Sequence, residues 1–173
     1  FANADTLATS YVIVSAAKML GDFDLIFCGK ESLDGATGQM GAQLAQRFGA
    51  AQVTGALLIK EVNEEAKTAV VERELEDGVE TLEVKLPSLF TMEKVNYPAR
   101  IPNLKGKLAA KKAVITTITA DDIPGLDRGR IGDPGSPTKV PRMFPPVMPE
   151  PGIIIDEGSV EASVAKLMQL IKD

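Results

Sequence analysis

Residues 24–41 read DLIFCGKESLDGATGQMG, and this stretch decides the fold class of the chain. Its apolar run at residues 24–28 is short and is closed by Gly29. Such a run predicts a strand that is buried on both faces of a parallel sheet. The polar and small residues 30–38 that follow predict a loop. The stretch therefore leads from a buried strand into an open loop.

A helix is predicted directly after this loop. Met40, Leu44 and Phe48 recur at every fourth residue, which places them on one face of a helix. Gly49 suits the left-handed position that ends many helices. The stretch that opens this section is thus followed by a helix over residues 40–48.

A second helix is predicted upstream, capped by Asp5 or Thr6 and ending near Gly21. Its apolar side is marked by a series with helical spacing: Leu7, Tyr11 and Val14. Helix, strand, loop and helix in this order are typical of a doubly wound α/β domain with a mostly parallel sheet.

The middle of the chain predicts antiparallel strands. Residues 69–75 and 79–86 are rich in β-forming side chains and flank Asp77-Gly78, a strong signal for a hairpin. Residues 52–59 are a candidate to pair with this hairpin, and residues 89–92 predict a further strand. An antiparallel hairpin is therefore expected after the α/β start.

Residues 121–152 are rich in proline and glycine, which excludes long helices and central strands. An extended arm and a flexible linker both fit this composition. Apolar side chains in the segment favour an arm that docks on another surface: Val140, Met143, Phe144 and Val147. Residues 160–171 predict a closing amphipathic helix, capped by residue 158 or 159. We expect an α/β domain over residues 1–120 and an arm with a terminal helix over residues 121–173.

Composition limits the function. The 173 residues are 45% hydrophobic, enough for about one domain with a sizeable core. The chain has 19 Lys and Arg against 24 Asp and Glu, so nucleic-acid binding is not expected. With no His and one Cys, it lacks the groups for His-based catalysis, Cys/His zinc sites and an internal disulfide. The apolar runs are too short to insert in a membrane. Composition therefore points to binding or electron carriage.

The loop of residues 29–41 is the first candidate for a binding site. Ligands of open α/β sheets bind where a strand ends and a helix begins, and the free N–H groups of the first helical turn stabilise a phosphate. Gly35, Gly38 and Gly41 permit a close backbone approach, and Thr37 and Gln39 offer side-chain donors. A glycine-rich turn capped by Thr37 explains the same pattern about equally well.

Two further segments each allow two interpretations. Thr6 and Thr9 share a helix face, so they either contact a phosphate or ribose or serve only the start of the helix. Residues 100–112 are basic, and they form either a solvated face or a docking site with Ile101 and Leu104 as apolar anchors.

Taken together, these segments resemble the small (beta) subunit of electron-transfer flavoprotein. The resemblance rests on the loop of residues 24–41, the hairpin of residues 70–87, the recognition stretch of residues 100–112, and the arm and last helix. It covers nearly the whole chain, in the family's order. It implies an adenine nucleotide alpha hydrolase-like fold, with a nucleotide-binding domain over residues 1–120. Members begin with a strand upstream of Phe1, so we expect the N-terminal part of a subunit to be missing.

The resemblance also implies cofactor and partners. The small subunit of this family holds AMP in the ordinary group and FAD in the electron-bifurcating group. Residues 5–10 and 135–138 look like the bifurcating group, which favours FAD, with AMP as the alternative. Expected partners are the large (alpha) subunit, an acyl-CoA-type dehydrogenase and NADH. The location implied is the cytoplasm of a bacterium, or the mitochondrial matrix in a eukaryote. A non-redox, adenine-nucleotide-binding α/β module is the alternative function.

The family's motifs assign roles to individual residues. The positions matched to nucleotide contacts are Thr6, Thr9, Gly29, Ser32, Asp34, Thr37, Gly38, Gln39 and Met40. Because some members carry a hydroxyl where this chain has Met40, that contact is expected through the backbone N–H alone. The positions matched to partner docking are Ile101, Leu104 and Lys107. No catalytic side chain and no metal is expected, since a flavin supplies the redox chemistry itself.

Overall fold

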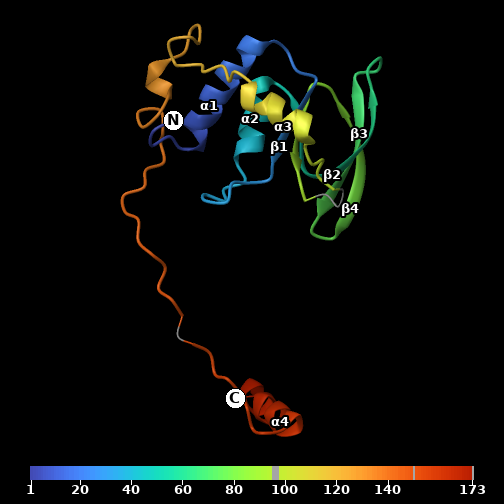
Figure 1. Cartoon of the computed structure of the whole chain (residues 1–173), viewed down its shortest axis with the longest axis vertical. Coiled ribbons are helices and arrows are strands. Elements are labelled where there is room, and N and C mark those ends of the chain that lie inside the picture. The colour runs from blue at the N-terminus through green and yellow to red at the C-terminus, as the bar shows by residue number, and fades with distance from the viewer. Residues whose placement is uncertain (95–97, 150, 173) are drawn as a thin grey trace. The chain divides into compact units, whose positions relative to one another are not determined.

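The computed structural model describes residues 1–94, 98–149 and 151–172. The chain divides into two compact units, Phe1–Lys139 and Val140–Asp173, and each is described by itself. The elements of the first unit, in order, are α1 (Thr6–Ala17), the short 3-10 helix η1 (Lys18–Leu20), β1 (Leu25–Gly29), α2 (Met40–Phe48), β2 (Ala51–Asn63), β3 (Thr68–Leu75), β4 (Gly78–Lys85), β5 (Ser88–Met92), α3 (Leu104–Lys112) and the 3-10 helix η2 (Arg128–Arg130) (Figure 1).

Five strands form one sheet in the order β1-β5-β2-β3-β4. β5 pairs in parallel with both β1 and β2, whereas β2, β3 and β4 pair antiparallel. The α/β class and the predicted hairpin are confirmed. The sheet is mixed rather than mostly parallel, because the hairpin extends it from β2 and contributes both antiparallel pairings.

The helical side of the sheet is closed by α1 and α2. Val14 of α1, Leu44 and Ala45 of α2 and Leu89 of β5 form one buried cluster. The close approach of α2 depends on Gly41, because a Cβ there would lie 2.2 Å from Cγ2 of Thr91. The predicted apolar face of α2 therefore meets the sheet. In α1 the prediction holds for Val14, whereas Leu7 remains 42% exposed and the other buried residues are Ala8 and Ser10.

A second cluster lies on strands alone. Its fully buried members come from β2, β3 and β5: Val53, Ala56, Ala69, Val71 and Phe90. β1 contributes little to it, and Phe27 remains 54% exposed although its ring stacks on Phe90 at 5.5 Å. The prediction that this strand is buried on both faces was therefore wrong, because β1 lies at the edge of the sheet and its one pairing in the described chain is with β5.

The local signals at the element ends are confirmed. Oδ1 of Asp5 accepts a hydrogen bond from the N–H of Ala8 at 3.0 Å and caps α1. Gly49 ends α2 in the left-handed conformation, with φ 71°. Leu75 pairs with Gly78 across the turn of the hairpin, so the two residues between them make the turn.

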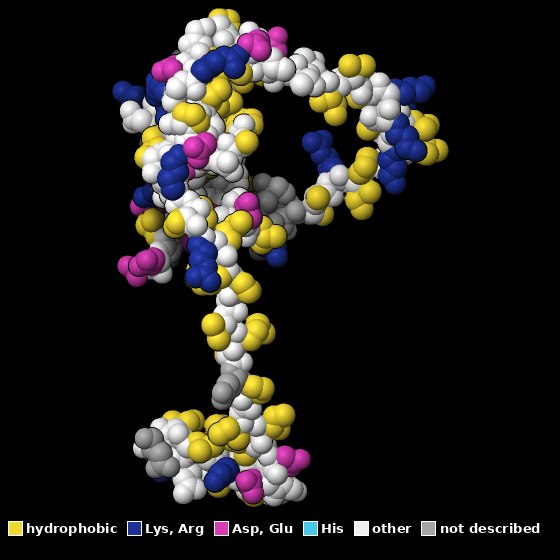
Figure 2. Space-filling view, turned by 90° about the vertical axis from the view of Figure 1, so that its left-hand side faces the viewer, with side chains coloured by type: hydrophobic (Ala, Val, Ile, Leu, Met, Phe, Trp, Pro, Cys, Tyr) yellow, Lys and Arg dark blue, Asp and Glu magenta, His cyan; other side chains and the backbone are white. Residues whose placement is uncertain are grey.

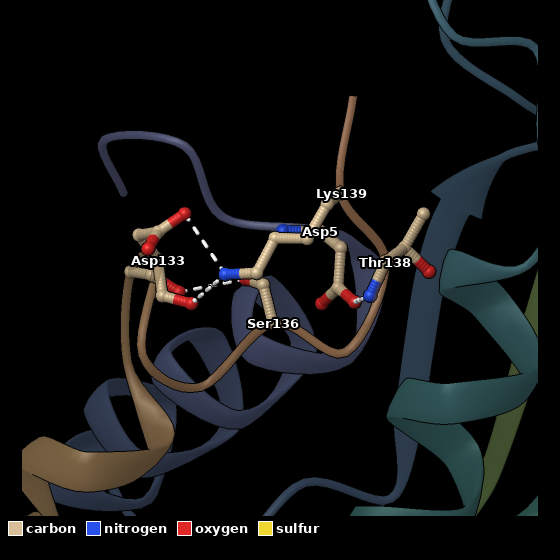
Figure 3. A network of polar contacts seen from close by, with 6 residues as sticks. Asp5, Asp133, Ser136, Thr138 and Lys139 are labelled. Carbon is tan, nitrogen blue, oxygen red and sulfur yellow. Dashed lines mark hydrogen bonds and ion pairs between the residues drawn. The ribbon is translucent and has the colours of Figure 1, made fainter. Parts of the chain in front are cut away.

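The segment after α3 is held against the start of α1 (Figure 3). Oγ of Ser136 accepts from the N–H of Asp5 at 2.8 Å, and Oδ2 of Asp5 accepts from the N–H of Thr138 at 3.0 Å. Lys139 closes the turn by pairing with Asp133 at 2.9 Å. These contacts place residues 121–139 in the first unit, whereas the expected boundary was at residue 120.

The second unit consists of an extended segment and α4 (Val160–Lys172). Oγ of Ser159 accepts from the N–H of Ala162 at 3.2 Å, which confirms one of the two predicted caps. None of the residues of α4 is buried, and Figure 2 shows hydrophobic side chains along the extended segment and on the helix.

Candidate functional site

The loop between β1 and α2 is open on all sides. Residues 31–39 are exposed, and Leu33 is fully so. Two contacts to Ser32 shape the loop: its carbonyl accepts from the N–H of Ala36 at 3.0 Å, and its hydroxyl accepts from the N–H of Gly35 at 3.4 Å. The first turn of the loop is therefore held by its own residues, while its outer surface can meet a ligand.

The backbone of the loop changes hand twice. Ala36 has φ 44° and Gly38 has φ 61°, both in the left-handed region. Left-handed residues between right-handed ones turn successive N–H groups toward a common side, as in anion-binding nests. Gly38 adopts this conformation at no steric cost, so the glycine predicted to permit a close approach does have special geometry.

The N-terminus of α2 has no side-chain cap. Gln39 is the N-cap residue but has helical backbone angles and makes no capping hydrogen bond. Oγ1 of Thr37 accepts from the N–H of Gln39 at 3.5 Å, so it does not reach the first turn of the helix. The amides of that turn and the positive end of the helix dipole are therefore available to an anion.

The structure brings Thr6 and Gln39 together across 33 residues of sequence. Oγ1 of Thr6 donates to Oε1 of Gln39 at 2.8 Å and accepts from Nε2 of Gln43 at 3.1 Å. Thr9, predicted to act beside Thr6, is linked to the cap only through its helical N–H bond to the carbonyl of Asp5. Thr6 thus joins α1 to the mouth of the loop, and Thr9 does not.

Gln43 is a residue that the sequence reasoning missed. Its Oε1 is buried and has no hydrogen-bond partner within the described ranges. An unpaired buried carbonyl costs about 1–3 kcal/mol, so this oxygen calls for a donor from water or a ligand. The available signal was its spacing, because Gln43 lies four residues after Gln39 and therefore on the same helix face.

Asp34 gives the loop a fixed negative charge. A hydrogen bond from the hydroxyl of Ser32, followed by one from the N–H of Gly35, lowers the pKa of Asp34 below its ordinary value. A carboxylate repels a phosphate but accepts readily from hydroxyl and amino groups. Asp34 is therefore suited to the ribose or base of a nucleotide, while the α2 amides are suited to its phosphate.

Most of the basic stretch forms the helix α3. Oδ1 of Asn103 accepts from the N–H of Gly106 at 2.8 Å and starts the helix. Leu104, its first residue, is 73% exposed, Ile101 just before it is 87% exposed, and Lys107 lies one turn further on. A merely solvated face explains the lysines but not the exposed leucine and isoleucine.

A metal site and a reactive thiol are the two other kinds of site to consider among the described residues. No group of three or more His, Cys, Asp or Glu within them could hold a metal ion. The thiol of Cys28 is half-buried against the carbonyl of Phe90 at 3.7 Å, and burial raises its pKa. A thiol in that state is a weak nucleophile, as expected for a packing residue.

Comparison with known proteins identifies the family of this chain. Residues 1–123 match the electron transfer flavoprotein domain family. The chain belongs to the electron transfer flavoprotein family. The match includes the loop, α2, Thr6 and α3, and it confirms the resemblance found in the sequence.

Individual relatives extend the match of this electron transfer flavoprotein chain over its whole length. The electron transfer flavoprotein subunit beta of Thermoanaerobacterium thermosaccharolyticum is 37% identical over 171 residues, covering 98% of this chain and 63% of the relative. The caffeyl-CoA reductase-Etf complex subunit CarD of Acetobacterium woodii is 35% identical over 173 residues, covering 100% of this chain and 64% of the relative. The protein FixA of Azorhizobium caulinodans is 33% identical over 177 residues, covering 99% and 63%.

The electron transfer flavoprotein chain thus spans slightly less than two thirds of the length of these relatives. No helix among its described residues is long and apolar enough to cross a membrane. The cellular compartment stays a prediction.

Proposed function

We propose that this chain binds an adenine nucleotide as part of the small subunit of an electron transfer flavoprotein and serves electron transfer between a donor and a partner oxidoreductase. The observation that carries the proposal is the N-terminus of α2. It has no side-chain cap, follows an exposed loop with left-handed turns, and lies beside the Thr6–Gln39 hydrogen bond.

The residues fit a nucleotide in a definite way. The first-turn amides of α2 would hold a phosphate, and the carboxylate of Asp34 would accept from a hydroxyl or amino group. Met40 packs against the buried cluster of Val14 and Leu44, so the backbone N–H is its route to a ligand. The unpaired Oε1 of Gln43 would gain a donor when the site fills.

We propose FAD as the nucleotide, with AMP as the alternative. The reason is the resemblance of residues 5–10 and 135–138 to the bifurcating group, together with the similarity to a subunit of a caffeyl-CoA reductase-Etf complex. A bound flavin supplies the redox chemistry, whereas the protein supplies position and electrostatics, so the lack of His is no obstacle. NADH is the electron donor that this assignment implies.

The exposed apolar surfaces suggest where partners bind. Ile101 and Leu104, with Lys107 at the rim, would form an apolar anchor for an acyl-CoA-type dehydrogenase. The second unit, with no buried residue in α4, would dock on the large subunit. Partners of this kind would cover apolar side chains that soluble proteins rarely leave exposed in such number.

The nucleotide is tested by isolating the full-length subunit with its large subunit and releasing all bound ligands. We expect flavin absorbance beyond the amount held by the large subunit. Adenine nucleotide without additional flavin would assign AMP instead. A complex with neither ligand in the small subunit would refute nucleotide binding.

The site itself is tested by substitution on α2. Gln39→Ala removes the acceptor of the Thr6 bond, so we expect about tenfold weaker nucleotide binding, measured by ligand retention during dialysis. Gln46→Ala is the matched control, because Gln46 lies exposed on the same helix. Equal retention in the two variants would exclude the Thr6–Gln39 pair from the site.

Docking is tested separately through α3. Leu104→Ala should slow electron transfer to the partner dehydrogenase at least about tenfold if Leu104 is a buried anchor in the complex. Val114→Ala is the control, since Val114 is 94% exposed but lies beyond the helix. Unchanged rates with intact nucleotide binding would refute the docking role of Leu104.

A further inference from the structure

A cavity lies between α1 and the segment around η2, and no residue of the loop 30–39 lines it. Its volume is about 370 Å³, which is at the small end of the range of ligand sites. Its walls come from α1, the end of α2 and the segment after η2: Leu7, Tyr11, Arg47, Arg130, Ser136 and the prolines 134 and 137. None of the predicted nucleotide contacts is among its lining residues.

Two arginines share one aromatic ring in this cavity. The guanidinium carbon of Arg130 lies 4.2 Å from the ring centroid of Tyr11, and that of Arg47 lies 5.5 Å from the same centroid. Stacking on an aromatic ring orients a planar guanidinium without using its N–H donors. The cavity thus concentrates two positive charges whose donors can point to a ligand.

Arg47 is fixed in place by neutral partners. Its Nε donates to Oγ of Ser10 at 2.9 Å, and its Nη2 donates to the carbonyl of Leu7 at 3.1 Å. Two of its five N–H groups are used in this way, so three remain. The side chain is therefore positioned in advance, while its charge is not neutralised by these partners.

The neighbouring cations differ from these two arginines. Arg128 pairs with Asp121, and Lys139 pairs with Asp133. Within residues 1–94, 98–149 and 151–172, neither Arg47 nor Arg130 has a carboxylate within salt-bridge distance. The nearby carboxylate of Asp127 accepts from the N–H of Gly129 at 2.8 Å. The two cations at the cavity therefore lack the local anions that their neighbours have.

The hydroxyl of Tyr11 completes the donor set. It accepts from the N–H of Asp127 at 2.9 Å, so its own hydrogen is free to donate elsewhere. Two guanidinium forks and a phenol hydroxyl match the geometry and charge of phosphate oxygens, and the prolines and Leu7 offer apolar walls beside them. We propose that this cavity binds a phosphate-bearing anion at a site separate from the loop of residues 30–39.

The test uses the full-length subunit in complex with its large subunit, with inorganic pyrophosphate as the probe and calorimetry as the readout. Arg130→Gln should weaken binding about tenfold or more, because it removes a charged fork. Arg128→Gln is the matched control, since this arginine lies two residues away, is ion-paired with Asp121 and does not line the cavity. It should retain affinity within about twofold.

Two further variants keep the test decisive. Arg130→Lys retains the charge but not the fork, so it should bind several-fold more weakly even if Arg130→Gln proves unstable. Gln39→Ala, in the nucleotide site, should leave pyrophosphate affinity unchanged. The proposal is overturned if pyrophosphate does not saturate the wild-type complex, if the Arg128 and Arg130 variants lose affinity equally, or if Gln39→Ala abolishes binding. It is also overturned if Arg130→Gln instead separates the subunits, which would assign the cavity to a carboxylate of the partner chain.

Discussion

The helices α2 and α4 both have amphipathic sequences, but only α2 buries its apolar side chains. α2 buries Leu44 and Ala45 against the sheet, whereas α4 leaves Val160, Leu167 and Ile171 at 75%, 45% and 68% exposure. The same periodicity therefore produces a core helix in the first unit and an uncovered apolar face in the second. An amphipathic pattern predicts a helix and its apolar side, but it does not identify the surface that covers this side.

The difference extends to the units as wholes. The first unit has two buried clusters of its own, one under the helices and one on the strands. The extended segment of the second unit instead exposes Met143 at 89%, Phe144 at 72% and Val147 at 93%. The stability of the fold should therefore depend on the first unit, and association with the large subunit on the second.

Core truncation should show the contrast most strongly. Phe90 is completely buried, so Phe90→Ala should lower the free energy of unfolding by about 3–5 kcal/mol, measured by denaturant titration. Phe144→Ala removes the same side chain from an exposed site in the second unit and should change it by less than about 0.5 kcal/mol. Comparable losses in the two variants would contradict the division of roles.

Two glycine substitutions compare the close packing of α2 in the first unit with the open segment of the second unit. In Gly41→Ala the new Cβ would lie 2.2 Å from Cγ2 of Thr91, so α2 must move. The free energy of unfolding should therefore fall by about 1–3 kcal/mol. Gly152→Ala meets no atom within 4 Å and should be neutral within about 0.5 kcal/mol. Thermal unfolding followed by circular dichroism measures both, and a neutral Gly41→Ala would show that α2 packs less closely than described.

Acid should loosen the first unit through Asp5. Desolvation raises the pKa of this carboxyl, but hydrogen bonds from Ala8, Thr138 and other donors outweigh it and hold the pKa below 3.8. The charged form thus contributes stability that is present above the ordinary pKa and is lost as the pH falls through the lower, folded value.

Asp5→Asn should therefore lower the free energy of unfolding by about 1 kcal/mol relative to wild type near pH 7. This difference should shrink as the pH falls below about 4. The free energy of unfolding of both proteins would be measured by denaturant titration from about pH 2.5 to about pH 7, which is roughly the range over which carboxyls titrate. Asp156→Asn, which removes a carboxylate bonded to Gly158 in the second unit, is the control. A constant gap between wild type and Asp5→Asn at every pH would exclude the charge as its cause.

The smallest expected effect on unfolding is on α4. Leu167→Asp places a charge on its exposed apolar face and should leave the denaturation midpoint of the first unit unchanged. The same change should weaken binding to the large subunit about tenfold or more, measured by sedimentation of the mixed subunits. Tight binding by the variant would show that another part of the second unit makes the interface.

Several elements were predictable because their signals are local. The spacing of Met40, Leu44 and Phe48 with Gly49 after them identified α2, and Asp77-Gly78 identified the hairpin, since neighbouring residues alone decide such features. The exposure of Phe27 was not predictable, because it depends on the place of β1 at the sheet edge. The same apolar run would suit a central strand.

For the candidate site, the sequence by itself determined the loop, its glycines and the helix that follows, because these depend on backbone preferences over a few residues. Only the tertiary structure decided that Thr6 bonds Gln39, that Gln43 carries a buried unpaired oxygen, and that Arg130 stacks on Tyr11 beside Arg47. These partners are far apart in the chain. Their meeting follows from how α1, α2 and the segment around η2 pack together, which no local pattern encodes.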